Sequence, residues 1–448
     1  MSQKTNELAQ SLERKLDSFD PDERREALDG LIDEVEAGRI HLPKPGQDVN
    51  MHCHTFFSFN TYGYSPTKFA WLARKNGLAA AGTVDFDVLD ALEEFHQARR
   101  KLGLKGCSGL ETRVYVPEFA DKVMTSPGEP GITYHMGVGF PTARLEGPLA
   151  EFQRMLKDTA QRRNQDLMAR VNAYLSPVEL DYEKDVLTLT PKGNATERHM
   201  CTAYARKARA IFGDGSSLAA FWGEKLGADP GKLELPEGRT LLDTIRKKTM
   251  KQGGVGYVRP DTGSFPRMAE TNRFIAACGA IPTLTWLDGT SDGERRIEAL
   301  LKVAMKTGVA VVNIVPDRNY TPGARDEKLK NLYEVVDICR RLDLSIIVGT
   351  EMNSPGQRFV DDFSTDELSP LLPIFLEGAY IFYAHTVLQQ QCALGYVSRW
   401  AAKHFPKRGL RNAFYHQIGR VLRVEDEDKL AALNSNMSPR EVLKAAGV

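Results

Sequence analysis

From residue 48 onward, short runs of apolar residues alternate with longer stretches whose apolar positions recur at helical spacing. Short apolar runs bounded by Gly, Pro or Asp predict buried strands, and we expect them at 48–54, 78–85, 104–111, 133–140, 280–287, 309–315, 344–351 and 378–385. The stretches between them predict helices over 65–75, 88–103, 292–306 and 327–342. Strands separated by helices favour a parallel sheet with right-handed crossovers, and this number of strands suits an α/β barrel.

Two parts of the chain break this alternation. Residues 1–45 have the pattern of amphipathic helices, with Asp20 and Pro21 typical of a helix start. Residues 141–270 contain long helical patterns and predict an inserted, mainly helical subdomain. We therefore expect a helical extension over 1–45, a first barrel part over 46–140, the insertion over 141–270, a second barrel part over 271–390 and a C-terminal helical segment over 391–448.

The composition is that of a globular protein and narrows the function only slightly. The 448 residues are 42% hydrophobic, and 59 basic side chains balance 59 acidic ones. This balance gives no sign of a nucleic-acid-binding field over the whole surface, although it leaves a local basic groove open. The six cysteines form no C-x-x-C pair, which favours reduced thiols in the cytoplasm. With neither a signal-peptide pattern nor a long apolar stretch, we expect no membrane contact.

The clearest candidate chemistry is the pair His52 and His54 at the end of the first predicted strand. Side chains two residues apart on a strand point to the same face, so both imidazoles emerge together while Cys53 packs on the other side. In a barrel, the C-terminal strand ends carry the active site, and imidazole binds zinc, iron and manganese well. On its own, the pair is equally compatible with two ordinary polar residues at a strand end.

Later strands bring further ionisable groups to the same rim. Asp85, Glu111 and Glu351 end predicted strands, and His135 lies within the fourth strand. Acids at strand ends can simply cap the helix that follows, which is the ordinary interpretation of Asp87. A glutamate is a poor cap, so this interpretation is weaker for Glu111. The sequence therefore predicts a cation site built from several strands.

Longer stretches of the chain follow the order of a known family. VNMHCHTFFSFNTYGYSPTKFAWLARKNGLAAAGTVDFDVLDALEEF, GLE at 109–111 and YHMGVGF resemble the opening motifs of the PHP (polymerase and histidinol phosphatase) superfamily. TERHMCTAYARKARAIFGDGSSLAAFWGEKL and QGGVGYVRP are similar to the arm of its branch that acts on nucleoside 3',5'-bisphosphates and RNA 5' ends. IPTLTWLDG and VGTEMN resemble two later strand ends of that family, so the resemblance covers residues 48–355.

The resemblance implies a distorted (β/α)7–8 barrel of PHP type that holds one or two divalent ions, such as Mn, Zn, Fe or Mg. Histidine ligands of the family are replaced by Phe86, Trp286 and Asn353. Transfer by position gives the metal ligands His52, His54, Glu111, His135 and Glu351, with Asp288 and His385 as candidate substitutes. Catalytic roles would fall to Asp85, Glu111 and His135.

Four further side chains are candidates for binding a substrate phosphate. Arg198 and His199 begin a helix that the resemblance places over the site, and both guanidinium groups and helix N-termini bind phosphate. Arg318 and Arg358 follow predicted strand ends. The ordinary alternative for all four is a solvated or capping role. The aromatic loop FFSFNTYGYSP can stack on a base or close the barrel mouth.

Together these features predict a metal-dependent phosphoesterase acting on a phosphomonoester or phosphodiester of a small metabolite or nucleotide, with an RNA or DNA end as a further candidate. The metal would activate water and neutralise phosphate charge. The altered ligand set keeps two alternatives open. One is a non-catalytic binding or scaffold protein with this fold, and the other is a metal-dependent hydrolase or lyase with a non-phosphate substrate.

Overall fold

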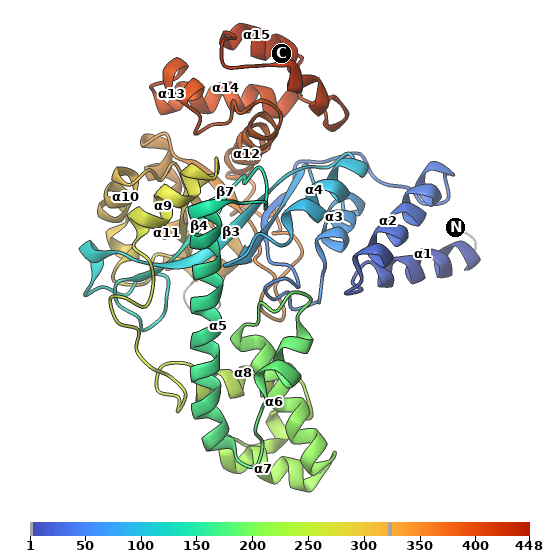
Figure 1. Ribbon diagram of the computed structural model, residues 1–448, viewed down its shortest axis with the longest axis vertical. Coiled ribbons are helices and arrows are strands. Elements are labelled where there is room, and N and C mark those ends of the chain that lie inside the picture. Colours follow the sequence, from blue (N-terminus) through green and yellow to red (C-terminus); the bar gives the residue numbers. More distant parts are fainter. Residues whose placement is uncertain (1–2, 321–324) are drawn as a thin grey trace. The chain divides into compact units, whose positions relative to one another are not determined.

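Figure 1 shows the chain as a computed structural model, which describes residues 3–320 and 325–448. The chain divides into two compact units, each of which is described by itself. The first comprises Met1–Thr55, Asn60–Phe152 and Phe265–Val448, and the second comprises Phe56–Phe59 and Gln153–Ser264. The first unit contains all of the β-sheet.

Seven strands form one sheet, and they follow one another in chain order. They are β1 (Val49–Cys53), β2 (Ala80–Phe86), β3 (Lys105–Tyr115), β4 (Ile132–Val138), β5 (Ile281–Trp286), β6 (Val311–Ile314) and β7 (Ser345–Val348). The sheet is nearly closed, because Glu351, just after β7, forms a parallel bridge with Cys53 at the end of β1. The fold is thus a distorted α/β barrel, as the sequence predicts.

The direction of β4 corrects the expectation of a parallel sheet, because β4 runs antiparallel to both β3 and β5. Parallel neighbours need a long crossover, normally a helix, whereas antiparallel neighbours need only a short connection. Residues 116–131, all of which the structure describes, form a single 3₁₀ turn, η1 (Pro117–Phe119), and no α-helix. The chain therefore returns directly beside β3.

In the described part of the chain, six helices surround the barrel, and α3, α4, α10 and α11 lie where the sequence predicts helices. The helix α3 shows why: the Ser65 side chain caps it by accepting a hydrogen bond from the Lys68 amide, and Pro66 is its first residue. The barrel helices are α3 (Pro66–Lys75), α4 (Leu92–Lys101), α9 (Met268–Ala277), α10 (Ile297–Lys306), α11 (Arg325–Arg341) and α12 (Leu372–Cys392).

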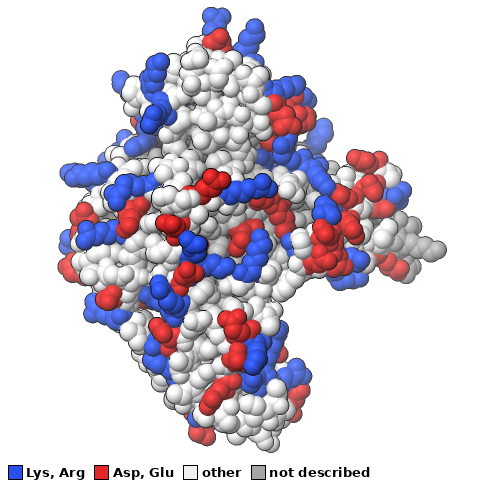
Figure 2. Space-filling view, viewed as in Figure 1, with Lys and Arg blue, Asp and Glu red and all other residues white. Residues whose placement is uncertain are grey.

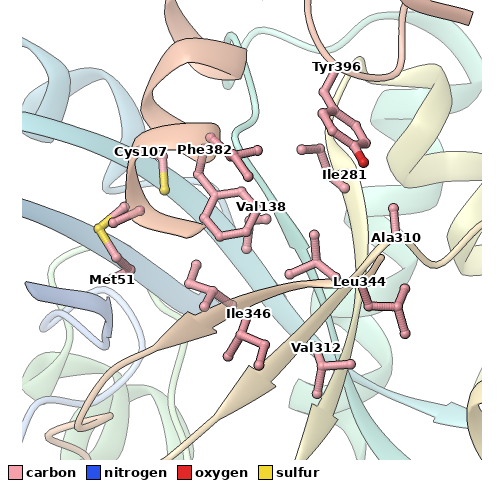
Figure 3. Close-up of a cluster of buried hydrophobic side chains, with 14 of the residues drawn as sticks. Met51, Cys107, Val138, Ile281, Ala310, Val312, Leu344, Ile346, Phe382 and Tyr396 are labelled. Carbon is pink, nitrogen blue, oxygen red and sulfur yellow. The ribbon is translucent and has the colours of Figure 1, made fainter. Parts of the chain in front are cut away.

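The helix α12 corrects the prediction of an eighth strand over 378–385. A short apolar run has the same appearance in a buried strand and in a buried helix, and here the run lies inside a helix that is buried on most sides. Gly378 allows this helix to approach the sheet closely, because a Cβ atom there would collide with the carbonyl oxygen of Ile346. Figure 3 shows Phe382 of α12 among core side chains of the strands.

The largest apolar core is built from residues of the strands and of α12. Its members include Met51, Cys107, Ile281, Val312 and Ile346, all buried and packed with residues of α12. Burying this much apolar surface is the main source of stability for the barrel.

The remaining helices lie outside the barrel. In the first unit they are α1 (Gln3–Lys15), α2 (Pro21–Glu36), α13 (Arg399–His404), α14 (Arg408–Val421) and α15 (Pro439–Ala445). α5 (Gly147–Leu175) leads into the second unit, which contains α6 (Glu197–Phe212), α7 (Ser216–Leu226) and α8 (Arg239–Ile245) around a core of its own. Further 3₁₀ or π turns are η2 (Tyr182–Val186), η3 (Leu187–Leu189), η4 (Pro230–Lys232), η5 (Arg246–Met250), η6 (Glu294–Arg296), η7 (Pro316–Tyr320) and η8 (Val424–Ala432).

Two surface properties bear on the function. Among the helices that the structure describes, none has the length and apolar character needed to cross a bilayer. Figure 2 shows acidic and basic side chains intermingled on the face in view, in keeping with the zero formal net charge. This face therefore presents no extended field of one sign.

Candidate metal centre

The interior face of the sheet carries polar side chains near the C-terminal ends of several strands. Side chains alternate between the two faces along a strand, and directly paired residues share a face. The register pairs Glu111 with Met136 and Met136 with Thr283. Thr285, two residues beyond Thr283, therefore shares the face of Glu111, and so does its partner Asn313 on β6.

His52 and His54 meet Glu111 on this face, and these three residues are called the metal cluster below. The Nε2 atom of His54 lies 3.2 Å from Oε2 of Glu111, and Nε2 of His52 lies 3.6 Å from the same oxygen. Their ligand atoms all lie within 4.8 Å of one another, and all three side chains are buried. The register of β1 with β2 shifts between Asn50 and Cys53, and such irregular pairing commonly re-aims side chains beside functional sites.

Asn313 determines how His52 presents its ring nitrogens. The Oδ1 atom of Asn313 lies 3.2 Å from Nδ1 of His52, and because an amide oxygen only accepts, the proton of a neutral ring must sit on Nδ1. Nε2 of His52 then turns a lone pair toward Glu111 and forms no hydrogen bond. Two buried acceptors that face each other need a proton or a metal ion between them. Two histidines and a glutamate are a common ligand set for zinc, so the residues fit a divalent metal.

The electrostatics of the metal cluster favour a positive charge at its centre. Burial lowers the pKa of His52, but the neighbouring carboxylate of Glu111 outweighs burial, so the pKa is raised. Burial raises the pKa of Glu111, but its contacts with His52 and His54 outweigh this effect and lower the pKa. Both shifts stabilise a carboxylate next to a cation.

Glu351 adjoins the metal cluster through its backbone. Its amide donates to the carbonyl of His52, and its carbonyl accepts from the amide of His54, both at 2.8 Å. Its φ of 60° is left-handed, which is uncommon for a residue other than glycine and is frequent at functional sites. The carboxylate lies 3.2 Å from Nη2 of Arg318 and accepts from Gln357 at 3.4 Å. Burial raises the pKa of Glu351, but the charge of Arg318 counteracts burial and the pKa is lowered.

Aromatic rings occupy two positions where the sequence resemblance expects histidine ligands. The ring of Phe86 stacks on that of His54, with ring centroids 4.2 Å apart and planes 28° apart. Trp286, at the end of β5, is buried. The metal cluster is thus smaller than the ligand set that the resemblance implies, and one face of the His54 ring packs against an apolar group.

Asp85 does not face the metal cluster. It lies one residue before Phe86 on β2 and therefore on the opposite face of the sheet. Its carboxylate accepts hydrogen bonds from the amide and the hydroxyl of Thr55, at 2.8 and 2.7 Å. Asp85, a predicted catalytic residue, thus lies outside the metal cluster and holds the chain that leaves β1, directly after His54.

The predicted ligand His135 also lies on the opposite face. It pairs with Thr112, the neighbour of Glu111 on β3, so its ring points away from the barrel interior. Its Nε2 atom lies 2.5 Å from Oδ1 of Asn272 on α9. Burial lowers the pKa of His135 to about 4, so the ring is neutral. The structure therefore places His135, a predicted ligand and catalytic residue, outside the metal cluster.

The structure also separates His385 from the metal cluster. Its Nδ1 atom accepts from the amide of Tyr396 at 2.9 Å, and its Nε2 atom lies 3.0 Å from the carbonyl oxygen of Gly139. Both ring nitrogens are thus engaged by the backbone, and burial lowers the pKa of His385 to about 4. His385, a predicted ligand candidate, thus lies outside the metal cluster, and its contacts link α12 to the chain after β4.

Arg198 and His199 lie in the second unit and have partners there. Arg198 forms an ion pair with Asp243. His199 completes a capping box, in which its Nδ1 accepts from the Thr196 amide at 3.0 Å, and its ring meets the edge of Phe59. Burial lowers the pKa of His199 to about 4, so it carries no charge for a phosphate. These contacts account for both residues without a ligand.

The other predicted residues of the rim are also engaged by neighbours. Arg358 is 61% exposed and lies 3.5 Å from Asp362. Asp288 pairs with Lys328 at 2.9 Å and accepts from the hydroxyl of Thr290. Neither belongs to the metal cluster. Among the described residues, the histidine, cysteine and acidic side chains that come close enough together to hold a metal ion are those of His52, His54 and Glu111.

Sequence reasoning missed Thr285 and Asn313. Both are polar residues inside otherwise apolar strands, in TLTW and VVNIV, and that contrast is the signal that points to them. A buried polar side chain in a central strand needs a partner, so such an interruption favours a functional or hydrogen-bonding role.

Comparisons with known proteins do not assign this chain to a family. No protein-family model matches the chain, and no curated protein matches it. A solved amidohydrolase from Chromobacterium violaceum, with bound sulfate and no metal, is 15% identical, with a TM-score of 0.48 over 70% of this chain and 91% of its own. A protein from Bifidobacterium adolescentis, provisionally described as a metal-dependent phosphoesterase, is 16% identical, with a TM-score of 0.44 over 74% of this chain and 97% of its own. Similarity at this level says nothing about what this chain does.

Proposed function

We propose that this chain is a metal-dependent hydrolase whose divalent ion is held by the metal cluster. The observation that carries the proposal is that Nε2 of His52, which forms no hydrogen bond, and Nε2 of His54 both face one oxygen of Glu111. A bound cation would satisfy all three groups. Three protein ligands also match catalytic zinc sites, which keep a further position open for water or substrate.

Each residue near the metal cluster would have a distinct role in hydrolysis. A divalent ion supplies Lewis acidity, which lowers the pKa of water toward neutrality and offsets charge on a leaving oxygen. His52 and His54 would hold the ion through Nε2, and Glu111 would hold it through Oε2. Asn313 holds His52 in the tautomer that leaves Nε2 unprotonated. Phe86 keeps the His54 ring in place and excludes water from one side of it.

The proposed substrate is a phosphoester of a small metabolite or nucleotide, a class that includes RNA and DNA ends. Arg318 supports this choice, because its guanidinium lies 3.2 Å from the buried Glu351 while 42% of its side chain is exposed. It therefore reaches from a buried carboxylate to the solvent-exposed surface, and guanidinium binds phosphate through paired hydrogen bonds. The resemblance of the sequence to the PHP superfamily points to the same substrate class.

The test compares metal content and hydrolysis of a chromogenic aryl phosphate. Purified protein is loaded with Mn²⁺ or Zn²⁺, and its metal content and turnover are measured beside those of a His52→Ala, His54→Ala double variant. His41→Ala is the matched control, because His41 is an exposed histidine outside the barrel rim. We expect the double variant to lose metal and turnover and the control to keep both. Equal metal content in all three proteins would refute the proposal.

The burial of the metal cluster favours a second candidate function. All three ligand side chains are almost completely buried, as they are in structural metal sites, so the ion would then brace a barrel that binds a partner without catalysis. In that case the loaded protein would gain thermal stability from the metal and hydrolyse neither the aryl phosphate nor an aryl ester. Turnover that depends on His52 and His54 would exclude this candidate.

A further inference from the structure

Two polar side chains stand next to each other on the interior face of the barrel, close to the metal cluster. Thr285 on β5 and Asn313 on β6 are direct partners in the parallel register, and both are fully buried. Adjacent strands run about 4.8 Å apart, so two paired side chains on one face can hold the same small group. Asn313 also contacts His52, which joins this pair to the metal cluster.

Both side chains have a polar atom that no neighbour satisfies. Within residues 3–320 and 325–448, the hydroxyl of Thr285 and the Nδ2 atom of Asn313 are buried and have no hydrogen-bond partner. Buried polar groups in folded proteins are almost always paired, since an unpaired one destabilises the fold. Two such atoms side by side therefore indicate a group that is bound there in the working protein.

The orientation of Asn313 defines the chemistry of that group. Its oxygen is engaged by Nδ1 of His52, so only the amide N–H groups remain for a ligand. The Thr285 hydroxyl adds another donor. Thr283, on the same strand and face, shows the contrast, because its hydroxyl already donates to the carbonyl of Ile281 at 3.1 Å. The pair thus presents neutral donors, which suit an acceptor with several oxygens.

We propose that Thr285 and Asn313 form the subsite that binds the oxygens of the substrate's phosphoryl group beside the metal cluster. This inference rests on the proposed function. Neutral donors can bind an anion without placing a second positive charge next to a metal ion, and hydrogen bonds to an anion are stronger than those to a neutral group. The subsite would thereby select a tetrahedral oxyanion over a planar carbonyl substrate.

The experiment measures binding of inorganic phosphate to the metal-loaded protein by calorimetry. Thr285→Val removes the hydroxyl and keeps the shape, and we expect it to weaken phosphate binding about tenfold. Thr285→Ser keeps the hydroxyl and should bind like the wild type. Thr283→Val is the matched control, since it removes a hydroxyl from the same face that already has a partner. Metal content is measured for every variant.

A second variant tests the other half of the subsite. Asn313→Asp retains an oxygen that can accept from His52 but has no N–H groups, and it places a negative charge beside the anion. We expect it to keep the metal and to lose phosphate binding by more than tenfold. Retained metal separates this effect from damage to the metal cluster, and the melting temperature reports whether the variant folds.

The outcomes separate the inference from the function on which it rests. A wild-type protein that takes up no metal refutes the proposed function, and the subsite with it. A protein that takes up metal while Thr285→Val and Thr283→Val bind phosphate equally refutes the subsite alone. Equal binding would mean that water, rather than substrate, satisfies the two atoms.

Discussion

Arg99 on α4 and Glu427 in the C-terminal segment form a buried, bidentate ion pair, with Nη1–Oε1 and Nη2–Oε2 distances of 2.7 and 3.2 Å. The hydroxyl of Tyr383 on α12 donates to the same carboxylate at 2.9 Å. Arg99 also donates from Nε to Nδ1 of His96 at 2.8 Å. One carboxylate therefore connects a barrel helix, the buried helix α12 and the end of the chain.

The first prediction concerns the stability of this network. Glu427→Gln removes the charge that Arg99 needs, and an uncompensated buried guanidinium should destabilise the protein by about 3–5 kcal/mol. Urea unfolding followed by circular dichroism measures the change. The control is Glu425→Gln, whose exposed pairing with Arg423 should contribute less than about 1 kcal/mol. Equal midpoints for the two variants would show that the buried pair adds nothing.

The second prediction concerns the pH dependence of stability. Asp361 is buried, and burial, together with the charge of Asp317, raises its pKa from 3.8 to about 7. The folded state thus favours the neutral carboxyl, so its stabilising contribution is complete below pH 3.8 and is lost as the pH rises through 7.

Asp361→Asn removes this titration. Between pH 5 and 7, the stability of the wild type relative to the variant should fall by about 2–3 kcal/mol, measured as urea unfolding at each pH. Asp362→Asn serves as the control, since the pKa of that exposed neighbour is lowered by its hydrogen bonds to Ser364. Parallel pH profiles for the wild type and Asp361→Asn would contradict the prediction.

The third prediction concerns metal and thermal stability. A ligand that binds only the folded state stabilises it by about 2.7 kcal/mol at one hundred times its dissociation constant. Zn²⁺ should therefore raise the melting temperature of the wild type, and a chelator should reverse the rise. Glu111→Gln should abolish the response, whereas the exposed Glu118→Gln should leave it unchanged. A zinc response in Glu111→Gln would place the ion elsewhere.

The fourth prediction compares two arginines that follow strand ends. Arg318 touches the buried Glu351, whereas Arg358 is mostly exposed and pairs only loosely with Asp362. We expect Arg318→Met to raise KM for a phosphoester about tenfold, a change of about 1.4 kcal/mol, and Arg358→Met to change it less than twofold. Steady-state kinetics on the metal-loaded enzyme measure both values. Equal KM for Arg318→Met and Arg358→Met would show that Arg318 does not bind the substrate.

The strand pattern of the barrel was predictable because most strands are short apolar runs between helical stretches. The fact that His52 and His54 share a face also follows from strand geometry alone. The prediction of a strand over 378–385 was wrong because a run of apolar side chains suits a buried helix as well as a buried strand. The length of the helix and the close contact of Gly378 with Ile346 distinguish a helix from a strand here. Neither can be read from residues 378–385 alone.

The face of each later residue was not predictable, because it depends on register between strands. His135 is a histidine at the expected place in the chain, yet the antiparallel pairing with β3 puts it opposite Thr112 and turns it away from Glu111. The parallel register of β5 and β6 pairs Asn313 with Thr285, and Asn313 contacts His52. A change of one residue in either pairing would exchange these positions.

The hydrogen bonds between Glu351 and the backbone of His52 and His54 have a consequence for how the barrel holds together. They form the seam where the last strand of the sheet meets the first, and the side chains on one side of that seam are the proposed ligands. An ion bound there would hold the first and last strands together, so that separation of the two strands and release of the ion would occur in the same step. Hydrogen exchange at the amides of His54 and Glu351 should then slow together when metal is added, while amides in β3 and β4, far from the seam along the sheet, should respond less.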